Sequence, residues 1–402
     1  YIPINTTNMN TMERATVPHK RVDVADVLRG LAVMGIILLH TIEHFNFYSF
    51  PDTAGQGAWL NFTDRAVWDG LFFLLGGKAY AIFALLFGFS FFIQDDNQRM
   101  RGKDFRARFC WRLLLLFVIG NFNAMFFTAE ILVMYSLIGF VLVATCRLSN
   151  KVLLWLVAIC LLQPVALYNI VRAVADPAYV VPSIPTGEYW QAAFAVQSGG
   201  GFWDTVKVNL WEGQLASLAW AWDHGRIFQT AGLFMLGMLI GRQGWLLKSS
   251  LPGWGRVLAW ALVAFFPLYG LNNMLPSFIE NANILGPLSL LVSSLANFAF
   301  MLVLVSGVLF GFYCSEKVCR VFRLLIPYGK MSMTNYVTQS IAGSLIFYNW
   351  GFGMHAHLGI TASVCVGALL FILQYSFCRW WIGRHSHGPM EYAWKRATWI
   401  SL

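Results

Sequence analysis

Residues 284–313 read ILGPLSLLVSSLANFAFMLVLVSGVLFGFY, a run of 30 residues without a charged side chain. About 20 apolar residues are enough for an α-helix to cross the hydrocarbon core of a bilayer. The run is too long for a strand, and its apolar residues do not alternate with polar ones at period two. It therefore predicts a membrane-spanning helix.

Nine further apolar runs occur along the chain, and the ten together cover residues 24–43, 66–93, 109–127, 129–146, 152–174, 226–247, 257–276, 284–313, 333–350 and 359–382. Only 12% of the residues are charged and 58% are hydrophobic, whereas roughly 25% are charged in soluble domains. This composition excludes a soluble or disordered chain. It predicts an all-α, polytopic transmembrane helical bundle of about ten spans. Gly76, Gly77 and Lys78 interrupt the second run, so a broken or re-entrant helix is expected near residues 76–80.

Lysine and arginine are concentrated in alternate connecting segments. These segments are residues 20–21, 99–108, 147–151, 242–256, 317–330 and 384–396. Cytoplasmic loops of membrane proteins carry such an excess, so both termini are expected in the cytoplasm. The same loops explain the net charge of +9, which therefore does not indicate a nucleic-acid partner.

The charge pattern also divides the chain into regions. Residues 1–20 form a polar N-terminal tail, residues 21–382 the bundle, and residues 383–402 a cytoplasmic amphipathic C-terminal segment. Residues 175–225 are rich in acidic side chains, proline, glycine and tryptophan, which predicts an extracytoplasmic loop with short interfacial helices. The seven cysteines lie in apolar spans or at basic loop edges, so disulfides are not expected.

Two side chains on the first span are candidates for chemistry. Arg29 and His40 are eleven residues apart, which is about 16 Å along a helix. An ionisable side chain at membrane depth usually faces a cavity or a partner, so His40 is a candidate general base. A structural histidine bonded to a neighbouring helix explains it equally well. His44 lies one turn further on, but two ligands do not make a metal site, and no metal is expected.

Other polar residues carry two interpretations each. Lys78 is either an anion anchor beside a broken helix or a lysine that snorkels to the bilayer surface. Glu130, in the turn between the third and fourth spans, could assist a histidine or merely face water. Asn335, Tyr336 and Gln339 begin the ninth span and could bind a polar ligand or bond neighbouring helices.

The cytoplasmic face is expected to be basic. Arg384, Lys395 and Arg396 follow the last span, and a basic loop follows Gln94. Such a face could hold the phosphates of a nucleotide-like cofactor or the headgroups of anionic lipids.

Three blocks of sequence together resemble the YeiB-like family of bacterial multi-pass membrane proteins, a family catalogued as a domain of unknown function. They are residues 21–36 (RVDVADVLRGLAVMGI), residues 77–89 (GKAYAIFALLFGF) with Glu130 further on, and residues 329–340 (GKMSMTNYVTQS) resumed at residues 388–391 (GPME). Their order and spacing fit, and the resemblance covers nearly the whole chain from about residue 20.

That family is distantly similar to the transmembrane acyltransferases, which include the acyltransferase-three proteins and the lysosomal heparan-glucosaminide acetyltransferase. The acyltransferase-three hallmark is an arginine, ten residues and a histidine on the first span, and Arg29 and His40 fit this spacing. The family commonly has asparagine in place of His40 and aspartate in place of Glu130, so this chain departs from it at two positions.

The resemblance implies a membrane-bound acyltransferase of the bacterial inner membrane. It would move an acyl group from cytoplasmic acyl-CoA, most simply acetyl-CoA, to an envelope sugar or a lipid-linked acceptor. His40 would be the general base or acyl carrier, with Glu130 assisting. The residues expected to bind donor or acceptor are Arg29, Lys78, Asn335, Tyr336 and Gln339. Membrane lipids and a second copy of the chain are expected partners.

Two alternatives remain open. A transporter or permeation protein for a small anionic solute would also use a broken helix and buried charges, although the sequence contains no evident inverted repeat. A non-catalytic binding protein is the third hypothesis, because the family variation at the position of His40 does not require every member to be an enzyme.

Overall fold

The computed structural model describes residues 22–51 and 55–400. Every regular element within these ranges is helical, which confirms the predicted all-α class. The predicted tail at residues 1–20 lies outside the described residues, as does the very end of the C-terminal segment.

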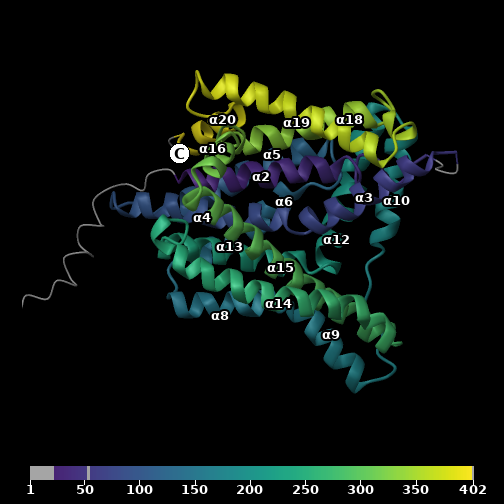
Figure 1. Ribbon diagram of the computed structural model, residues 1–402, viewed down its shortest axis with the longest axis horizontal. Coiled ribbons are helices and arrows are strands. Elements are labelled where there is room, and N and C mark those ends of the chain that lie inside the picture. Colours follow the sequence, from purple (N-terminus) through teal and green to yellow (C-terminus); the bar gives the residue numbers. More distant parts are fainter. Residues whose placement is uncertain (1–21, 52–54, 401–402) are drawn as a thin grey trace, which may run out of the picture.

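The longer helices run roughly parallel along one axis of the molecule (Figure 1). They are α2 (Asp23–His40), α3 (Ala58–Leu75), α4 (Ala79–Arg99), α5 (Arg106–Ala124), α13 (Arg226–Gln243), α14 (Leu251–Phe278), α15 (Ala282–Cys314), α18 (Ser332–Phe347) and α19 (Ile360–Ile382). The shorter ones are α6 (Ile131–Ile138), α7 (Phe140–Thr145), α8 (Asn150–Leu161), α9 (Pro164–Ala175), α10 (Thr186–Gly199), α11 (Phe202–Val208), α12 (Gln214–Asp223), α16 (Glu316–Arg323), α17 (Ile326–Lys330) and α20 (Pro389–Thr398). Each predicted apolar run thus corresponds to one helix or to two consecutive helices.

Four helical segments of the described chain are long and apolar enough to cross a membrane. They are Ala58–Arg99, Lys248–Phe278, Ala282–Cys314 and Ile360–Ile382, and the bent pair of α8 and α9 makes a fifth. The chain is therefore a membrane protein, and length and composition support four or five spans. The finer count of ten stays a prediction, because α2 and α5 carry three charged residues each near their starts and α18 has only 16 residues.

Two breaks interrupt these helices. The predicted one lies where α3 ends at Leu75 and α4 begins at Ala79. Gly77 has a φ of +74° there, a conformation that glycine adopts without steric cost. The second break was not predicted: residues 152–174, predicted as one span, form two helices that together still satisfy the length and composition of a span. Pro164 begins α9 after Gln163 at a bend of 53°, because proline cannot continue the hydrogen bonding of the preceding helix.

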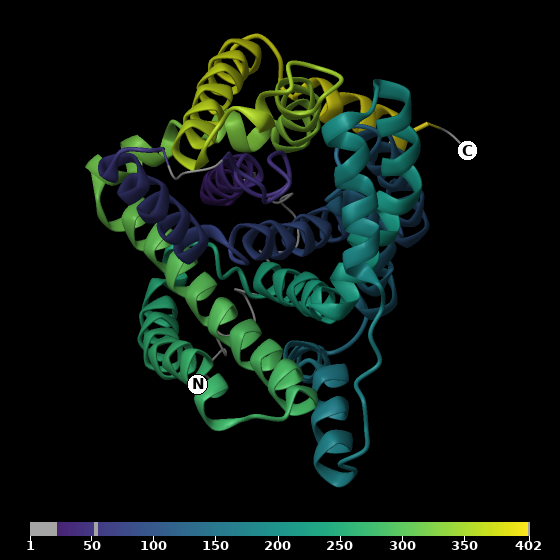
Figure 2. The same ribbon diagram turned by 90° about the vertical axis from the view of Figure 1, so that its right-hand side faces the viewer.

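The helix α2 lies in the interior of the bundle. Figure 2 shows it between α3 and α4 on one side and the C-terminal helices on the other. Most of its side chains are buried, so polar groups on α2 are removed from the surface. The candidate site residues Arg29 and His40 therefore lie on a central helix.

The two ends of the bundle differ in composition. Both ends of the described chain lie at one of them (Figure 1), which we call the basic end; α10, α11 and α12 lie toward the other, the far end. These three short helices occupy the loop predicted over residues 175–225. At the basic end α20 packs against α5, where Arg108 donates to the carbonyl of Thr398 at 3.0 Å and Arg112 lies 3.6 Å from the Trp394 ring. Cations near the last carbonyls of α20 favour its docking.

Candidate functional site

Arg29 is held between α2 and α4 near the basic end. Its Nη1 donates to Asp26 Oδ1 at 2.5 Å, and its Nη2 donates to Ser90 Oγ at 2.7 Å. Asp26 is buried, whereas the Arg29 side chain is 19% exposed. The guanidinium is therefore fixed in orientation but still reaches the surface.

His40 ends α2 and lies among aromatic rings from three segments. Its ring centroid is 4.5 Å from that of Phe127 and 5.8 Å from that of His44, and His44 stacks on Trp190 of α10 at 5.2 Å. We call His40, His44, Phe45, Phe127 and Trp190 the histidine cluster. The Nδ1 atoms of both histidines are buried and have no hydrogen-bond partner among the described residues. A buried polar atom without a partner costs about 1–3 kcal/mol, so a ligand group that bonds to either nitrogen would be favoured there.

Glu130 is buried in the bundle, with 1% of its surface exposed. The interpretation that it faces water is therefore wrong. The segment before it turns back into the bundle, so that the side chain of Asn123 and the backbone N–H of Leu132 donate to its carboxylate. The Tyr336 hydroxyl accepts from the N–H of Ile131 at 3.4 Å, which brings two of the predicted site residues close together.

Asn335 and Gln339 lie one turn apart on α18 but differ in their contacts. The Asn335 amide donates to the Tyr328 carbonyl at 3.0 Å, and its Oδ1 accepts from Cys378 at 3.1 Å. Asn335 thus joins α17, α18 and α19. Gln339 is fully buried, and neither its Nε2 nor its Oε1 has a partner within residues 22–51 and 55–400.

The histidine cluster lies one turn of α18 beyond Gln339. Gly343 is in such close contact with Phe45 that a Cβ there would lie 2.1 Å from the ring. Phe45 is in turn 5.1 Å from Phe127 and 6.1 Å from His40 between ring centroids. Gln339 therefore lies one turn away, on the same face of α18 as the glycine that contacts the histidine cluster.

Lys78 lies in the break between α3 and α4 and is only 7% exposed. Its Nζ donates to the Phe72 carbonyl at 3.4 Å and lies 5.6 Å from the centroid of the Phe300 ring. The snorkelling interpretation is wrong, because the ammonium group is packed inside the protein rather than at its surface. The anion-anchor interpretation stays a prediction.

Arg226 is a partly buried cation that the sequence does not single out. It begins α13, and its guanidinium lies 4.3 Å from the Tyr80 ring and 5.4 Å from the Trp220 ring. It is within electrostatic range of Lys78 and Glu43. The signal that could have found it is its position, because the predicted topology puts the start of this span on the non-cytoplasmic side, where arginine is rare.

Several arginines of the basic end are engaged in structural contacts. Arg147 bonds Asp95 at 2.9 Å, and Arg242 donates to the Cys146 carbonyl at 2.6 Å. The hydrogen bonds from Arg106 hold the pKa of Asp104 well below its usual range. These groups fasten loops to helices, so a phosphate ligand would have to meet other cations.

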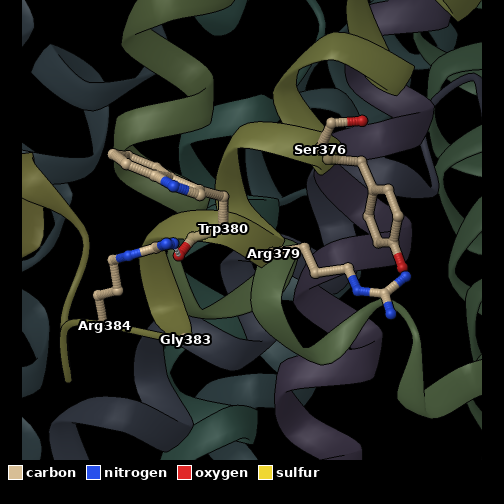
Figure 3. Close-up of a pocket in the computed structure, with 6 residues that line it drawn as sticks. Ser376, Arg379, Trp380, Gly383 and Arg384 are labelled. Carbon is tan, nitrogen blue, oxygen red and sulfur yellow. Dashed lines mark hydrogen bonds between the residues drawn. The ribbon is translucent and has the colours of Figure 1, made fainter.

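One surface pocket at the basic end presents two arginines. It is lined by Tyr375, Ser376, Arg379, Trp380, Gly383 and Arg384, all on or just after α19 (Figure 3). The Arg384 guanidinium lies 5.0 Å from the centroid of the Trp380 ring. Two guanidinium groups beside aromatic rings suit phosphates, whether of a donor or of a lipid headgroup.

Comparison with known proteins places this architecture in context. A family model described as a protein of unknown function (DUF418) matches residues 240–401. The chain is 25% identical to the uncharacterized protein YxaH of Bacillus subtilis over 419 residues, covering 96% of each chain. It is also 25% identical to the uncharacterized protein YeiB of Escherichia coli, covering 93% of this chain and 95% of YeiB. No solved structure gives a significant match. These matches confirm the predicted resemblance to the YeiB-like family, and none of them states an activity.

Proposed function

We propose that this protein is a membrane-bound acyltransferase of the bacterial inner membrane, with ten spans and both termini in the cytoplasm. It transfers an acyl group, most simply acetyl, from cytoplasmic acyl-CoA to a hydroxyl or amine of an envelope sugar or lipid-linked acceptor. One observation carries the proposal. His40, with a buried imidazole nitrogen that no described residue bonds, ends the same helix on which Arg29 reaches the surface near the basic end.

The distance between Arg29 and His40 along α2 suits the length of the acyl donor. Arg29 and His40 are eleven residues apart, about 16 Å along the helix, and an extended pantetheine arm can bridge such a distance. The phosphates of the donor would meet Arg29 and the cations of the basic end. The thioester would then lie beside the histidine cluster.

The chemistry follows from these positions. The His40 imidazole accepts the proton of the acceptor hydroxyl or amine, whose oxygen or nitrogen attacks the thioester carbonyl carbon. The carbon–sulfur bond breaks, and the CoA thiolate leaves and takes up a proton. The unpaired Gln339 amide can donate to the carbonyl oxygen as negative charge develops on it. Glu130 assists as a positioning residue. Its carboxylate bonds the Asn123 side chain, and the backbone carbonyl of Asn123 accepts from the N–H of Phe127, a member of the histidine cluster, at 3.2 Å.

The test is binding and turnover of labelled acetyl-CoA by detergent-purified protein. Wild type and His40→Ala are expected to bind the donor equally, and only wild type should release CoA when acceptor is supplied. His357→Ala removes an exposed histidine and should behave as wild type. Unchanged turnover in His40→Ala would remove His40 from the mechanism, and failure of folded protein to bind acyl-CoA would overturn the proposal.

A second candidate function is transport of a small anionic solute. The buried Lys78 beside a broken helix, within electrostatic range of Arg226, favours it. Uptake of an anion into proteoliposomes without any acyl donor would select this function over acyl transfer.

A further inference from the structure

Three side chains near the start of α4 and α13 form a group that we call the donor cluster: Lys78, Arg226 and Gln229. The Gln229 Oε1 accepts both from the Tyr80 hydroxyl and from Arg226 Nη1, the latter at 3.0 Å. Its acceptor capacity is therefore used. Gln229 Nε2 and Arg226 Nε are buried and have no partner in the part of the chain that the structure describes.

The unused hydrogen-bonding capacity of this cluster consists of donors. Guanidinium and ammonium groups only donate, and the remaining Gln229 group is an NH₂. Lys78 makes one long bond of 3.4 Å to a backbone carbonyl. A group that satisfies several such donors at once must carry several acceptor oxygens, as a carboxylate or phosphate does.

The charges of the cluster lead to the same conclusion. Lys78 and Arg226 are two cations within electrostatic range of each other, and Glu43 is one carboxylate within range of Arg226. Lys78 is buried and Arg226 is partly buried. Removing charge from water is costly unless the charge is paired, and two cations against one carboxylate leave positive charge to be compensated. An oxyanion would supply both the charge and the acceptors.

The backbone is also arranged for close approach. A Cβ on Gly77 would lie 3.0 Å from Asn297 Nδ2 and 3.5 Å from Arg226 Nη2. A larger side chain at residue 77 would crowd the Asn297 amide and leave less space between this turn and the Arg226 guanidinium. Glycine therefore brings the turn that carries Lys78 against Arg226.

The cluster lies far from the residues that are predicted to bind the phosphates of acyl-CoA. Lys78 precedes Ser90, the α4 partner of Arg29, by twelve residues, about 18 Å along α4. His40 follows Arg29 by about 16 Å along α2. Measured from Arg29, the donor cluster and His40 therefore lie at a similar distance toward the far end.

We propose that Lys78, Arg226 and Gln229 bind an oxyanion, the carboxylate or phosphate of the acceptor. The identification of the anion as part of the acceptor rests on the proposed acyltransferase function. The anion site itself does not require acyl transfer. The guanidinium fork of Arg226 suits the paired oxygens of such a group, and Lys78 contributes a point charge. The substrate class is thus an acidic sugar or a lipid-linked phosphate rather than a neutral alcohol.

The test measures anion binding to the full-length purified protein without acyl-CoA. The probes are inorganic phosphate, glucuronate and nanodiscs that contain phosphatidic acid. Arg226→Gln and Lys78→Met are expected to weaken binding of at least one probe tenfold or more, while Arg226→Lys weakens it less. Arg65→Gln removes a cation whose side chain is 88% exposed and should bind as wild type.

The outcomes are separable from those of the acyl-transfer test. His40→Ala should keep anion binding whether or not it loses turnover. Dependence on Arg226 with phosphatidic acid but not with glucuronate identifies a lipid-linked phosphate, and dependence with glucuronate but not with phosphatidic acid identifies an acidic sugar. If Arg226→Gln does not fold, Lys78→Met and Arg226→Lys decide the question. The proposal is overturned if the folded variants bind every probe as wild type does, or if wild type binds none.

Discussion

Glu391 of α20 and Thr334 of α18, 57 residues apart in the sequence, meet at the start of α18. The Glu391 carboxylate accepts from the Thr334 hydroxyl at 2.6 Å and from the backbone N–H groups of Met333 and Thr334 at 2.7 and 3.1 Å. The C-terminal helix thus caps another helix with its own side chain. The sequence blocks 329–340 and 388–391, which look separate in the sequence, form one junction.

The first prediction concerns this cap. Glu391→Ala leaves the first N–H groups of α18 without an acceptor, and bonds to a charged group contribute about 1.5–3 kcal/mol each. We expect a clear drop in melting temperature in detergent. Glu316→Ala, which removes an exposed glutamate from the first turn of α16, should change it little. Equal melting temperatures for the two variants would contradict the capping role.

The second prediction concerns the contact between α4 and α13, the helices that begin beside Lys78 and at Arg226. A Cβ on Gly88 would lie 1.9 Å from the Phe234 carbonyl oxygen, and one on Gly237 would lie 1.8 Å from that of Leu85. Overpacking costs about 1–3 kcal/mol or more, so Gly88→Ala and Gly237→Ala should each lower the melting temperature. Gly270→Ala on α14 meets no atom within 4 Å of the described structure and should not. A wild-type melting temperature for Gly237→Ala would show that the helices are less tightly packed.

The third prediction separates Gln339 from Asn335. Gln339→Leu removes buried polar atoms without protein partners in the described chain, so the melting temperature should stay the same or rise. Its acyl transfer should nevertheless fall about tenfold or more, because the amide no longer stabilises the developing oxyanion. Asn335→Leu breaks bonds among α17, α18 and α19 and should lower the melting temperature first. A Gln339→Leu variant with full turnover would make Gln339 dispensable for chemistry.

The fourth prediction concerns the identity of the base. His40→Asn keeps a polar side chain of similar size but cannot accept a proton at neutral pH. We expect turnover to fall about 100- to 10,000-fold, with donor binding retained. Single-turnover measurements with labelled acetyl-CoA check this. A smaller loss would indicate that His40 only positions the reactants.

Arg29 provides a fifth prediction. Arg29→Lys keeps the positive charge but lacks the planar guanidinium with which Arg29 donates to Asp26 and Ser90 at the same time. The KM for acyl-CoA should rise several-fold while kcat changes little, because the interaction is made equally in the bound and transition states. Steady-state kinetics over a range of acyl-CoA concentrations measure this. A fall in kcat at unchanged KM would place Arg29 in the chemical step.

The positions of the helices could be predicted from the sequence, and individual burial could not. Ten apolar runs correspond to helices because apolar length and composition are local properties of the chain. The bend before α9 also has a local cause in the sequence, because Pro164 cannot continue the hydrogen bonding of the preceding helix. The water-facing interpretation of Glu130 is wrong because a turn between two spans is normally exposed, whereas this one folds back toward Asn123 and α18.

The sequence by itself determined the all-α membrane class, the resemblance to the YeiB-like family and the position of Arg29 and His40 on one helix. These features depend on neighbours a few residues apart along the chain. Only the tertiary structure decided that Lys78 and Arg226 lie within electrostatic range of each other and that the buried Gln339 amide has no partner among the described residues. Such contacts join residues far apart in the sequence, and which polar groups meet depends on how the helices pack rather than on hydropathy.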